Sequence, residues 1–344
     1  MQDKIDKPIF VVGSPRSGTS VLTWCLEQHP NMFALPESGW IGDLAIDLAI
    51  RYQIGTARGD LSLLGAMDVQ REEFFAIFGS SINKLILNHR RDLDLHHFEL
   101  RRLRNARSGA AAVPTAFSTV HSTSDPKARW VDGTPENSFH ICGLRKLFPE
   151  ARFIHLVRDV TSVVRSLLNF FPDGRNRLVA NEQAAYDYWL RTVTACAKAE
   201  RAYGPSVVYR LRYSDLTDRS ESALRSLLNF LDEPYAAECL APLTERINSS
   251  NVPADFKIGD PETDAAVVEQ ATRLCSEVEK TSQSPEASPA AAVEIETAFE
   301  KRVQYVATVD SEYQRALRII TTLQKETAQL TARCSDRQSD SKTE

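Results

Sequence analysis

The stretch that decides the fold is PIFVVGSPRSGTSVLTW, residues 8–24. Its apolar beginning predicts a buried strand that ends at Gly13, and its last residues predict a helix. A strand, a glycine-containing turn and a helix in this order point backbone N–H groups and a helix N-terminus at one anion. We therefore expect a phosphate-binding loop at residues 13–20. Turns of this kind also serve only to pack a helix on a sheet, so the loop alone leaves its role open.

The residue types in this loop differ from those of the nucleoside-triphosphate loop G-x-x-x-x-G-K-[ST], which requires a lysine where this chain has Thr19. The cation lies inside the loop instead, at Arg16, and Ser17, Thr19 and Ser20 supply hydroxyl groups. A guanidinium donates two hydrogen bonds at once to a tetrahedral oxyanion. The pattern indicates a phosphate-like ligand and weakens the case for a magnesium-bound triphosphate.

Apolar runs separated by helical spacing predict further strands along the chain. Alternation of strands and helices is typical of a parallel sheet covered on both faces. We therefore expect an α/β protein, a P-loop-like three-layer α/β/α fold with a central parallel sheet of four or five strands. His155 falls within an apolar strand and is expected to be a core residue. The expected strands are residues 8–13, 32–35, 129–131, 152–157 and 206–211.

The helices between these strands are predicted from apolar residues at three- and four-residue intervals and from turn residues. Asp218, with Glu221 three residues later, predicts a capping box at the start of one of them. The other expected helices begin near residues 20, 42, 136, 160 and 178.

Composition changes along the chain predict its organisation. We expect an α/β domain at residues 1–278, within which residues 51–128 form a mostly helical insertion on the acceptor side. A Ser/Pro/Ala-rich linker at 279–292 leads to a helical segment at 293–334, and the tail 335–344 is expected to be disordered. Heptad character at 293–330 is incomplete, so we expect this helix to pack on the domain, with a homodimer left open.

Bulk properties restrict the function classes. The net charge of −5 gives no general attraction to nucleic acid or to an anionic membrane. The six cysteines occur singly, without metal-ligand spacing, which favours reduced thiols and predicts no metal site. The sequence shows neither a signal-peptide pattern nor an apolar run of about 20 residues that could span a bilayer. A cytoplasmic protein is expected.

A second arginine at a strand end adds another candidate anion-binding element to the one in the loop. Arg158 follows the strand 152–157, and Ser166 comes eight residues later on the next helix. In an open α/β sheet the carboxyl ends of strands line the ligand crevice, so both side chains can reach a ligand there. Two anion-binding elements at one sheet edge predict a ligand with two separated phosphates.

With these motifs the chain resembles the PAPS-dependent sulfotransferases, in particular the group of bacterial enzymes and tyrosylprotein sulfotransferases. SPRSGTS resembles the loop of that family that binds the 5′-phosphosulfate, and LVRDVTSVVRS resembles its 3′-phosphate motif. LRYSDL, with Tyr213, resembles a segment of the nucleotide pocket. The resemblance covers about residues 8–232. It implies a site for PAPS made of Arg16, Ser17, Gly18, Thr19, Ser20, Arg158, Ser166 and Tyr213.

The resemblance implies transfer of a sulfuryl group from PAPS to a hydroxyl or amine acceptor, which leaves PAP. Arg16 would stabilise the charge of the leaving phosphate. Glu37, which follows the second strand, corresponds to a catalytic glutamate and is the expected general base. A carboxylate at a helix start also has a purely structural explanation. His140 is retained as a catalytic candidate, and Asp132 is a further competitor.

Many relatives carry a lysine near the segment occupied here by VDGTPEN, where this chain has Gly133 and Thr134. The Thr134 hydroxyl or the Gly133 N–H could take its place, or Arg16 could act alone. The acceptor class stays open between a carbohydrate, a glycolipid and a small metabolite. Two other function classes are weighed, a nucleotide-kinase-like phosphotransferase and a non-catalytic nucleotide-binding or partner-binding protein.

Overall fold

The structure is a computed structural model that describes residues 7–90, 127–171, 177–244, 252–253, 255–280 and 283–340, with side chains as far as residue 330. Residues 91–126 of the expected insertion at 51–128 lie outside these residues.

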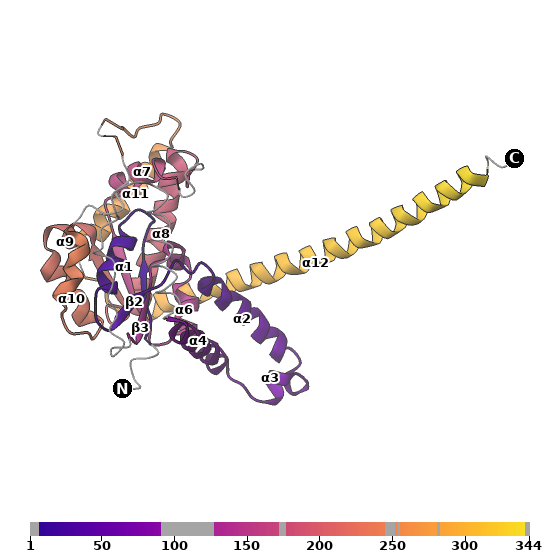
Figure 1. Cartoon of the computed structure of the whole chain (residues 1–344), viewed down its shortest axis with the longest axis horizontal. Helices are drawn as coiled ribbons and strands as arrows, with labels where there is room; N and C mark the ends of the chain where they lie inside the picture. Colours follow the sequence, from indigo (N-terminus) through magenta and orange to yellow (C-terminus); the bar gives the residue numbers. More distant parts are fainter. Residues whose placement is uncertain are drawn as a thin grey trace.

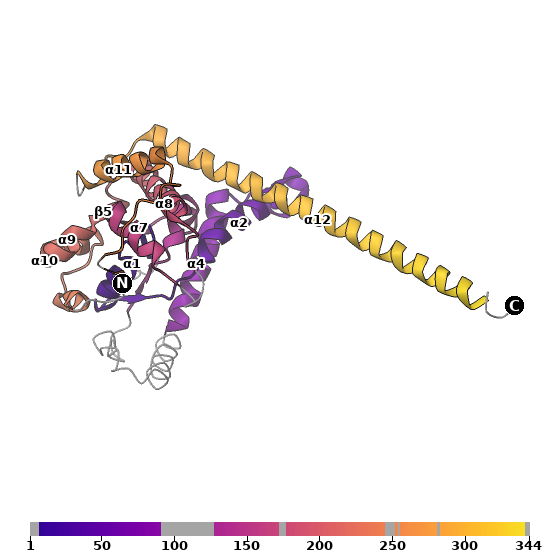
Figure 2. The ribbon, with the colours of Figure 1, turned by 90° about the horizontal axis from the view of Figure 1, so that it is seen from above.

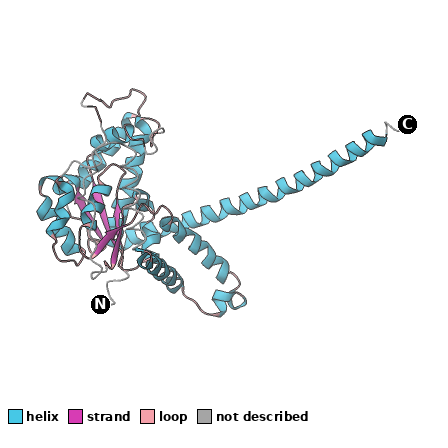
Figure 3. Ribbon diagram, viewed as in Figure 1, coloured by secondary structure: helices cyan, strands magenta, loops and turns pink. Residues whose placement is uncertain are grey.

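A five-stranded sheet, parallel throughout, forms the centre of the molecule (Figure 3). Its strand order is β2-β3-β1-β4-β5, which confirms the parallel α/β fold expected from the sequence. The order reverses next to β1, so the loop after β1 lies at the topological switch point where α/β proteins bind ligands. The strands are β1 (Ile9–Val12), β2 (Met32–Ala34), β3 (Arg129–Asp132), β4 (Arg152–Val157) and β5 (Val208–Arg212).

Side chains of β1 alternate between two hydrophobic cores, as the two-residue period of a strand requires. Ile9 and Val11 enter one core, and Phe10 and Val12 enter the other. The first core is closed by α1 (Thr19–Glu27), α9 (Tyr213–Asp218), α10 (Ser220–Phe230) and the 3-10 helix η5 (Ala237–Leu243). The second is closed by α2 (Ile41–Thr56), α4 (Arg71–Asn88), α6 (Ile141–Leu147), α8 (Glu182–Tyr203) and α12 (Pro289–Asp340).

A third apolar cluster joins α7 (Val160–Leu168), α8 and α11 (Ala265–Glu279) beside β4. Helix α11 was not expected from the sequence. Helix α8 begins at Glu182, a few residues after its expected start, because the Asn181 side chain accepts a hydrogen bond from the Ala184 N–H (2.9 Å) and caps it.

The expected capping box at Asp218 and Glu221 is wrong. Asp218 is the last residue of α9, and α10 begins at Ser220 without a side-chain cap. The cause lies in Asp215, which Arg212 reaches with two hydrogen bonds (2.7 and 2.9 Å) and which Arg219 also contacts. These contacts stabilise a separate short helix at 213–218, and Glu221 pairs with Arg225 within α10 instead.

The helix expected from Glu136 is divided in two. A 3-10 helix, η4 (Pro135–Phe139), comes first, and α6 starts at Ile141. Within the expected insertion, residues 51–90 contain the end of α2, the 3-10 helix η2 (Gly59–Leu61), α3 (Leu63–Ala66) and α4.

Helix α12 begins at Pro289 and packs on α8, α2 and α6 through its first turns, which include the buried Phe299 and Val303. Figures 1 and 2 show that the rest of the helix projects away from the domain. The helix continues to Asp340. The expectation of a disordered tail from residue 335 is therefore wrong as far as residue 340, and residues 341–344 lie outside the description.

His155 is fully buried, in agreement with the core position predicted for it. Its Nδ1 lies 2.8 Å from Glu200 on α8, and Glu200 also binds Arg210 of β5. Burial lowers the pKa of His155, but Cys196 and Glu200 outweigh burial and raise it. This buried charged cluster attaches α8 to strands β4 and β5.

Candidate active site

The loop at residues 13–18 connects β1 to α1 through backbone conformations that few residue types adopt. Gly13 has φ 145°, and a Cβ there would meet the Leu156 carbonyl oxygen at 2.5 Å. Arg16 has φ 70°, a left-handed conformation that is uncommon outside glycine, and Gly18 has φ 101°. Gly18 is the N-cap of α1 and offers no side-chain hydrogen bond to it. The first N–H groups of the helix are thus available to an anion.

The two basic motifs predicted from the sequence meet in the structure. Arg16 Nε donates a hydrogen bond of 3.0 Å to Ser166 Oγ, across 150 positions of sequence. Arg158 Nη1 donates to the Arg16 carbonyl oxygen, also at 3.0 Å. The loop after β1 and the end of β4 therefore form one cationic cluster.

The guanidinium groups of this cluster lie against aromatic rings. Arg16 lies over Phe170 with its Cζ 4.2 Å from the ring centroid, and Arg158 lies over Tyr213 at 4.4 Å. Burial lowers the pKa of Arg16, and the neighbouring charge of Arg158 lowers it further. Because the two like charges repel, an anion bound between them would relieve an unfavourable interaction.

The hydroxyl groups of the loop are not equivalent. Ser17 is buried, and its Oγ has no hydrogen-bond partner in the described part of the chain. A buried polar group without a partner is costly, and a ligand oxygen would satisfy it. Thr19 is also buried at the first turn of α1, and its carbonyl oxygen accepts from Thr23 Oγ1 (2.9 Å). Tyr213 closes the loop from the side: a Cβ on Gly18 would lie 2.6 Å from its ring.

A small cavity of about 190 Å³ lies between α1 and the end of β2. Ser20 and Glu37 both line it, together with Gly133. Glu37 is exposed enough to contact solvent, and partial burial raises its pKa, as do the nearby carboxylates Glu136 and Asp132. A carboxylate with a raised pKa beside an anion site is suited to accept a proton.

Asp132 is fully occupied by hydrogen bonds. Its Oδ1 accepts from the Thr134 N–H (2.9 Å) and hydroxyl (2.5 Å), and its Oδ2 accepts from Ser38 Oγ (2.6 Å) and Asn137 Nδ2 (3.0 Å). Thr134 Oγ1 in turn accepts from the Ser38 N–H (2.8 Å). This network holds the residue after Glu37 against the end of β3, so Asp132 and Thr134 position the Glu37 segment.

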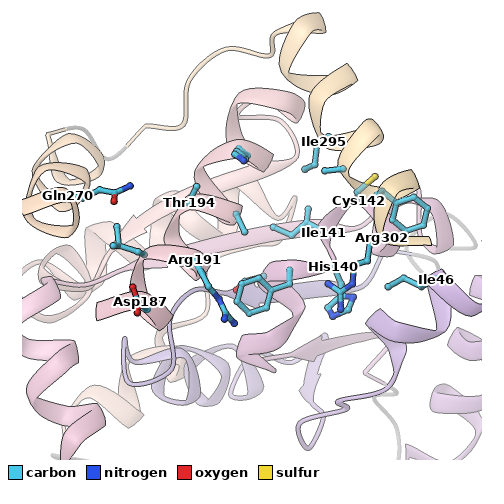
Figure 4. A pocket seen from close by; sticks show the side chains of 18 residues that line it. Ile46, His140, Ile141, Cys142, Asp187, Arg191, Thr194, Gln270, Ile295 and Arg302 are labelled. Atoms are coloured by element: carbon cyan, nitrogen blue, oxygen red, sulfur yellow. The ribbon is translucent and has the colours of Figure 1, made fainter. Parts of the chain in front are cut away.

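His140 lies apart from the cavity that contains Glu37. Its ring packs against Gly42 of α2, and its Nε2 is 3.5 Å from Asp43. Burial and the charge of Arg302 lower its pKa to about 4, so the ring is neutral near pH 7. His140 lines a second, larger cavity of about 730 Å³ between η4, α8 and α12, to which Arg191, Ile295 and Arg302 also contribute (Figure 4).

Several residues around the site were not foreseen. Phe170 under Arg16, the Ser138 hydroxyl that accepts from the Gly13 N–H (2.9 Å), and Tyr188, which donates to Glu136 (3.0 Å), all come from other elements. Of these three residues, only Phe170 could have been found from the sequence, because it follows Ser166 by four residues, about one helical turn. The described residues contain no group of three or more His, Cys, Asp or Glu that could hold a metal ion. None of the described helices is both long and apolar enough to cross a membrane.

The five-stranded parallel sheet, with a glycine-containing loop at its switch point and a second arginine directly after the neighbouring strand, defines the class of the chain as an α/β protein. The comparison with family models identifies the family. The model described as "Sulfotransferase family" matches residues 8–237, and the chain belongs to this family.

The chain is also similar to curated proteins and to solved structures. A protein of Caenorhabditis briggsae described as a putative protein-tyrosine sulfotransferase is 19% identical over 244 residues, which cover 70% of each chain. An uncharacterized protein of Aquifex aeolicus is 23% identical over 233 residues, 67% of this chain and 26% of that protein. Similar solved structures include the sulfotransferase domain from the curacin biosynthetic pathway (20% identity, 86% of this chain and 97% of that one, TM-score 0.38). A sulfotransferase from Mycobacterium avium has 18% identity, coverage of 83% and 79%, and a TM-score of 0.41.

Proposed function

We propose that this sulfotransferase moves a sulfuryl group from PAPS to a hydroxyl or amine acceptor and releases PAP. The observation that carries the proposal is the junction of Arg16, Ser166 and Arg158. The two motifs proposed to bind anions lie side by side, an arrangement that supports a nucleotide with phosphates on its 3′ and 5′ positions. The buried Ser17 hydroxyl without a partner and the open N-terminus of α1 support the fit of such a ligand.

In this proposal the donor supplies an activated sulfuryl group. The new bond forms between the acceptor oxygen and sulfur, and the bond from sulfur to the bridging phosphate oxygen breaks. Arg16 and the N–H groups at residues 18–20 stabilise the charge that develops on the leaving phosphate. Arg158 and Ser166 hold the 3′-phosphate, and Tyr213 borders the nucleotide.

Glu37 is the proposed general base. It lines the same cavity as Ser20 in the first turn of α1, directly after the loop, and we expect the acceptor hydroxyl to bind in this cavity. Its carboxylate takes the acceptor proton. Thr134 is engaged with both Asp132 and Ser38, which leaves the Gly133 N–H or Arg16 as the proposed replacement for the lysine found in many relatives.

The acceptor is proposed to be a hydroxyl-bearing carbohydrate, glycolipid or small metabolite. Two features of the site would serve any of these: the proposed base Glu37, and the hydrogen-bonded segment at residues 132–138 that positions it. In this proposal, the surfaces beyond this cavity determine which of the three acceptor classes binds.

Calorimetry with PAP and with Mg-ATP tests the proposal. We expect the protein to bind PAP at least tenfold more tightly than Mg-ATP, because Thr19 occupies the place of the triphosphate-binding lysine while Arg158 and Ser166 offer a second phosphate site. Equal or tighter binding of Mg-ATP would favour the phosphotransferase alternative. Absence of binding to both nucleotides would favour the partner-binding alternative.

A further inference from the structure

Helix α12 continues for some thirty residues beyond its contacts with the domain. Every side chain from residue 308 to residue 330 is exposed. This part of the helix projects away from the domain (Figure 2). Helices in proteins draw most of their stability from packing of an apolar face. The projecting part of α12 has such a face, and no other described segment of the chain covers it.

The exposed apolar residues follow a heptad repeat. Val309, Tyr313, Ala316, Ile320 and Leu323 alternate at intervals of four and three residues, and the series continues with Thr327 and Leu330. The five large apolar members are between 46% and 59% exposed: Val309, Tyr313, Ile320, Leu323 and Leu330. Arg315, Arg318, Thr322 and Lys325 lie off this stripe. A period of 3.5 residues is the signature of a left-handed coiled coil.

We propose that this stripe, residues 309–330 of α12, is the interface of a homodimer, in which α12 of a second copy packs antiparallel to it. When two copies of the stripe run in opposite directions, residues of similar size face each other. In one antiparallel register Tyr313 faces Leu330, Ala316 faces Thr327 and Ile320 faces Leu323 of the second copy, and the twofold axis repeats each layer. Each of these three pairs occurs twice, which gives six layers of facing residues. Four layers pair large apolar residues, and the other two pair Ala316 with Thr327.

The position of the domain selects the antiparallel direction. Phe299 and Val306 precede Tyr313 on the same heptad position, and both pack against the chain's own core. A parallel partner would have to bring its own residues 299–306 to the place that α2 and α8 already occupy. An antiparallel partner instead sets the two domains at opposite ends of the helix pair, where they do not meet.

The size of the contact is sufficient for a specific dimer. The 22 residues from 309 to 330 form a helix roughly 33 Å long. A helix pair of this length, with Leu317 and Ile319 flanking the stripe, buries on the order of 1,000 Å², about the lower limit for specific interfaces.

Light scattering on the full-length protein at micromolar concentration tests the proposal. We expect twice the chain mass of 38.5 kDa. The double variant Ile320→Glu/Leu323→Glu should be monomeric, because it places four carboxylates in the central layers. Arg318→Glu/Thr322→Glu, which changes the same turn of the helix off the stripe, should remain dimeric. A monomeric or trimeric wild-type protein would overturn the proposal, as would a dimer that survives the stripe variant.

Disulfide cross-linking tests the direction of the helices. In a Cys334→Ser background the remaining cysteines are buried. An oxidised mixture of Tyr313→Cys and Leu330→Cys chains should form the mixed disulfide, and each variant alone should form little. Efficient cross-linking of either variant with itself would show a parallel pair and overturn the arrangement. These measurements involve no nucleotide, so their outcome is independent of the proposed transfer reaction.

Discussion

Arg16 combines a left-handed backbone, a half-buried guanidinium and contacts to two distant motifs. A non-glycine residue in this conformation costs on the order of 1–3 kcal/mol, and the surrounding structure must compensate for it. The Arg158 hydrogen bond to its carbonyl and the Ser166 hydrogen bond to its Nε provide part of that compensation. The same contacts fix the loop in the shape that presents its N–H groups. The contacts that compensate for the strain therefore also hold the loop ready for an anion.

Sequence reasoning at the residue scale succeeded where function depends on local spacing. Arg16, Arg158 and Ser166 stand in short motifs next to strand ends, and their meeting follows from parallel strands that end at one edge. The role of Asp132 was harder to predict, because a carboxylate at a strand end could serve either as a base or as a positioning residue. Its role depends on Ser38 and Asn137, whose approach follows from the pairing of β2 with β3.

Glu37→Gln tests the proposed base. We expect PAP binding to be unchanged and turnover of PAPS to fall by roughly 10²–10⁴-fold, the usual contribution of a positioned base. Because burial and neighbouring carboxylates raise the pKa of Glu37, wild-type turnover should decline on acidification at a pH above the ordinary glutamate value of 4.5. The raised pKa also means that ionised Glu37 destabilises the fold, so the variant should unfold at an equal or higher temperature at pH 7.

His140→Gln is the matched control for that experiment. His140 lines the other cavity and faces Asp43, so this variant should retain turnover within a few fold and keep the acid limb of the pH profile. Retained turnover in Glu37→Gln together with its loss in His140→Gln would move the base to His140.

At the scale of elements, short apolar runs predicted all five strands, because a buried parallel strand is a continuous apolar run. Helix boundaries near polar residues were less predictable. The division between α9 and α10 depends on which arginines reach Asp215, and the division between η4 and α6 depends on how the segment after β3 packs at the site. Such choices are made by tertiary contacts, which override local capping signals.

Glu200→Gln tests the buried cluster that attaches α8 to the sheet. The substitution leaves Arg210 and His155 without a buried counter-charge, a change that typically costs about 3–5 kcal/mol of unfolding free energy. Chemical denaturation at pH 7 measures it. Glu269→Gln, which removes an exposed partner of Arg273 on α11, should change the unfolding free energy by less than about 0.5 kcal/mol. A similar small effect of both variants would contradict the structural role of the cluster.

The pH dependence of stability gives the same test an independent readout. Burial alone would raise the pKa of Glu200, but His155 and Arg210 lower it to about 2. Its ionised form therefore stabilises the fold above the ordinary glutamate pKa, and this stabilisation is lost as the pH falls toward the lowered value. The difference in stability between wild type and Glu200→Gln should shrink on acidification.

At the scale of the whole molecule, the domain and α12 serve different purposes. The proposed nucleotide site takes its residues from one chain, whereas the apolar stripe of α12 is covered by a second copy in the proposed dimer. Incomplete heptads at residues 293–306 concealed this pattern in the sequence, because those positions pack on the domain. Only the structure shows where the domain contacts end and the regular repeat begins.

The binding of PAP compared with 5′-AMP, measured by calorimetry, tests the central claim most directly. Wild type should prefer PAP, because the 3′-phosphate meets Arg158 and Ser166. In Arg158→Ala the affinity for PAP should fall roughly 10–100-fold, the value of a charge-assisted hydrogen bond, and approach that for 5′-AMP. The exposed-arginine control Arg273→Ala should bind PAP as wild type does. Equal affinity of wild type for PAP and 5′-AMP would contradict the account.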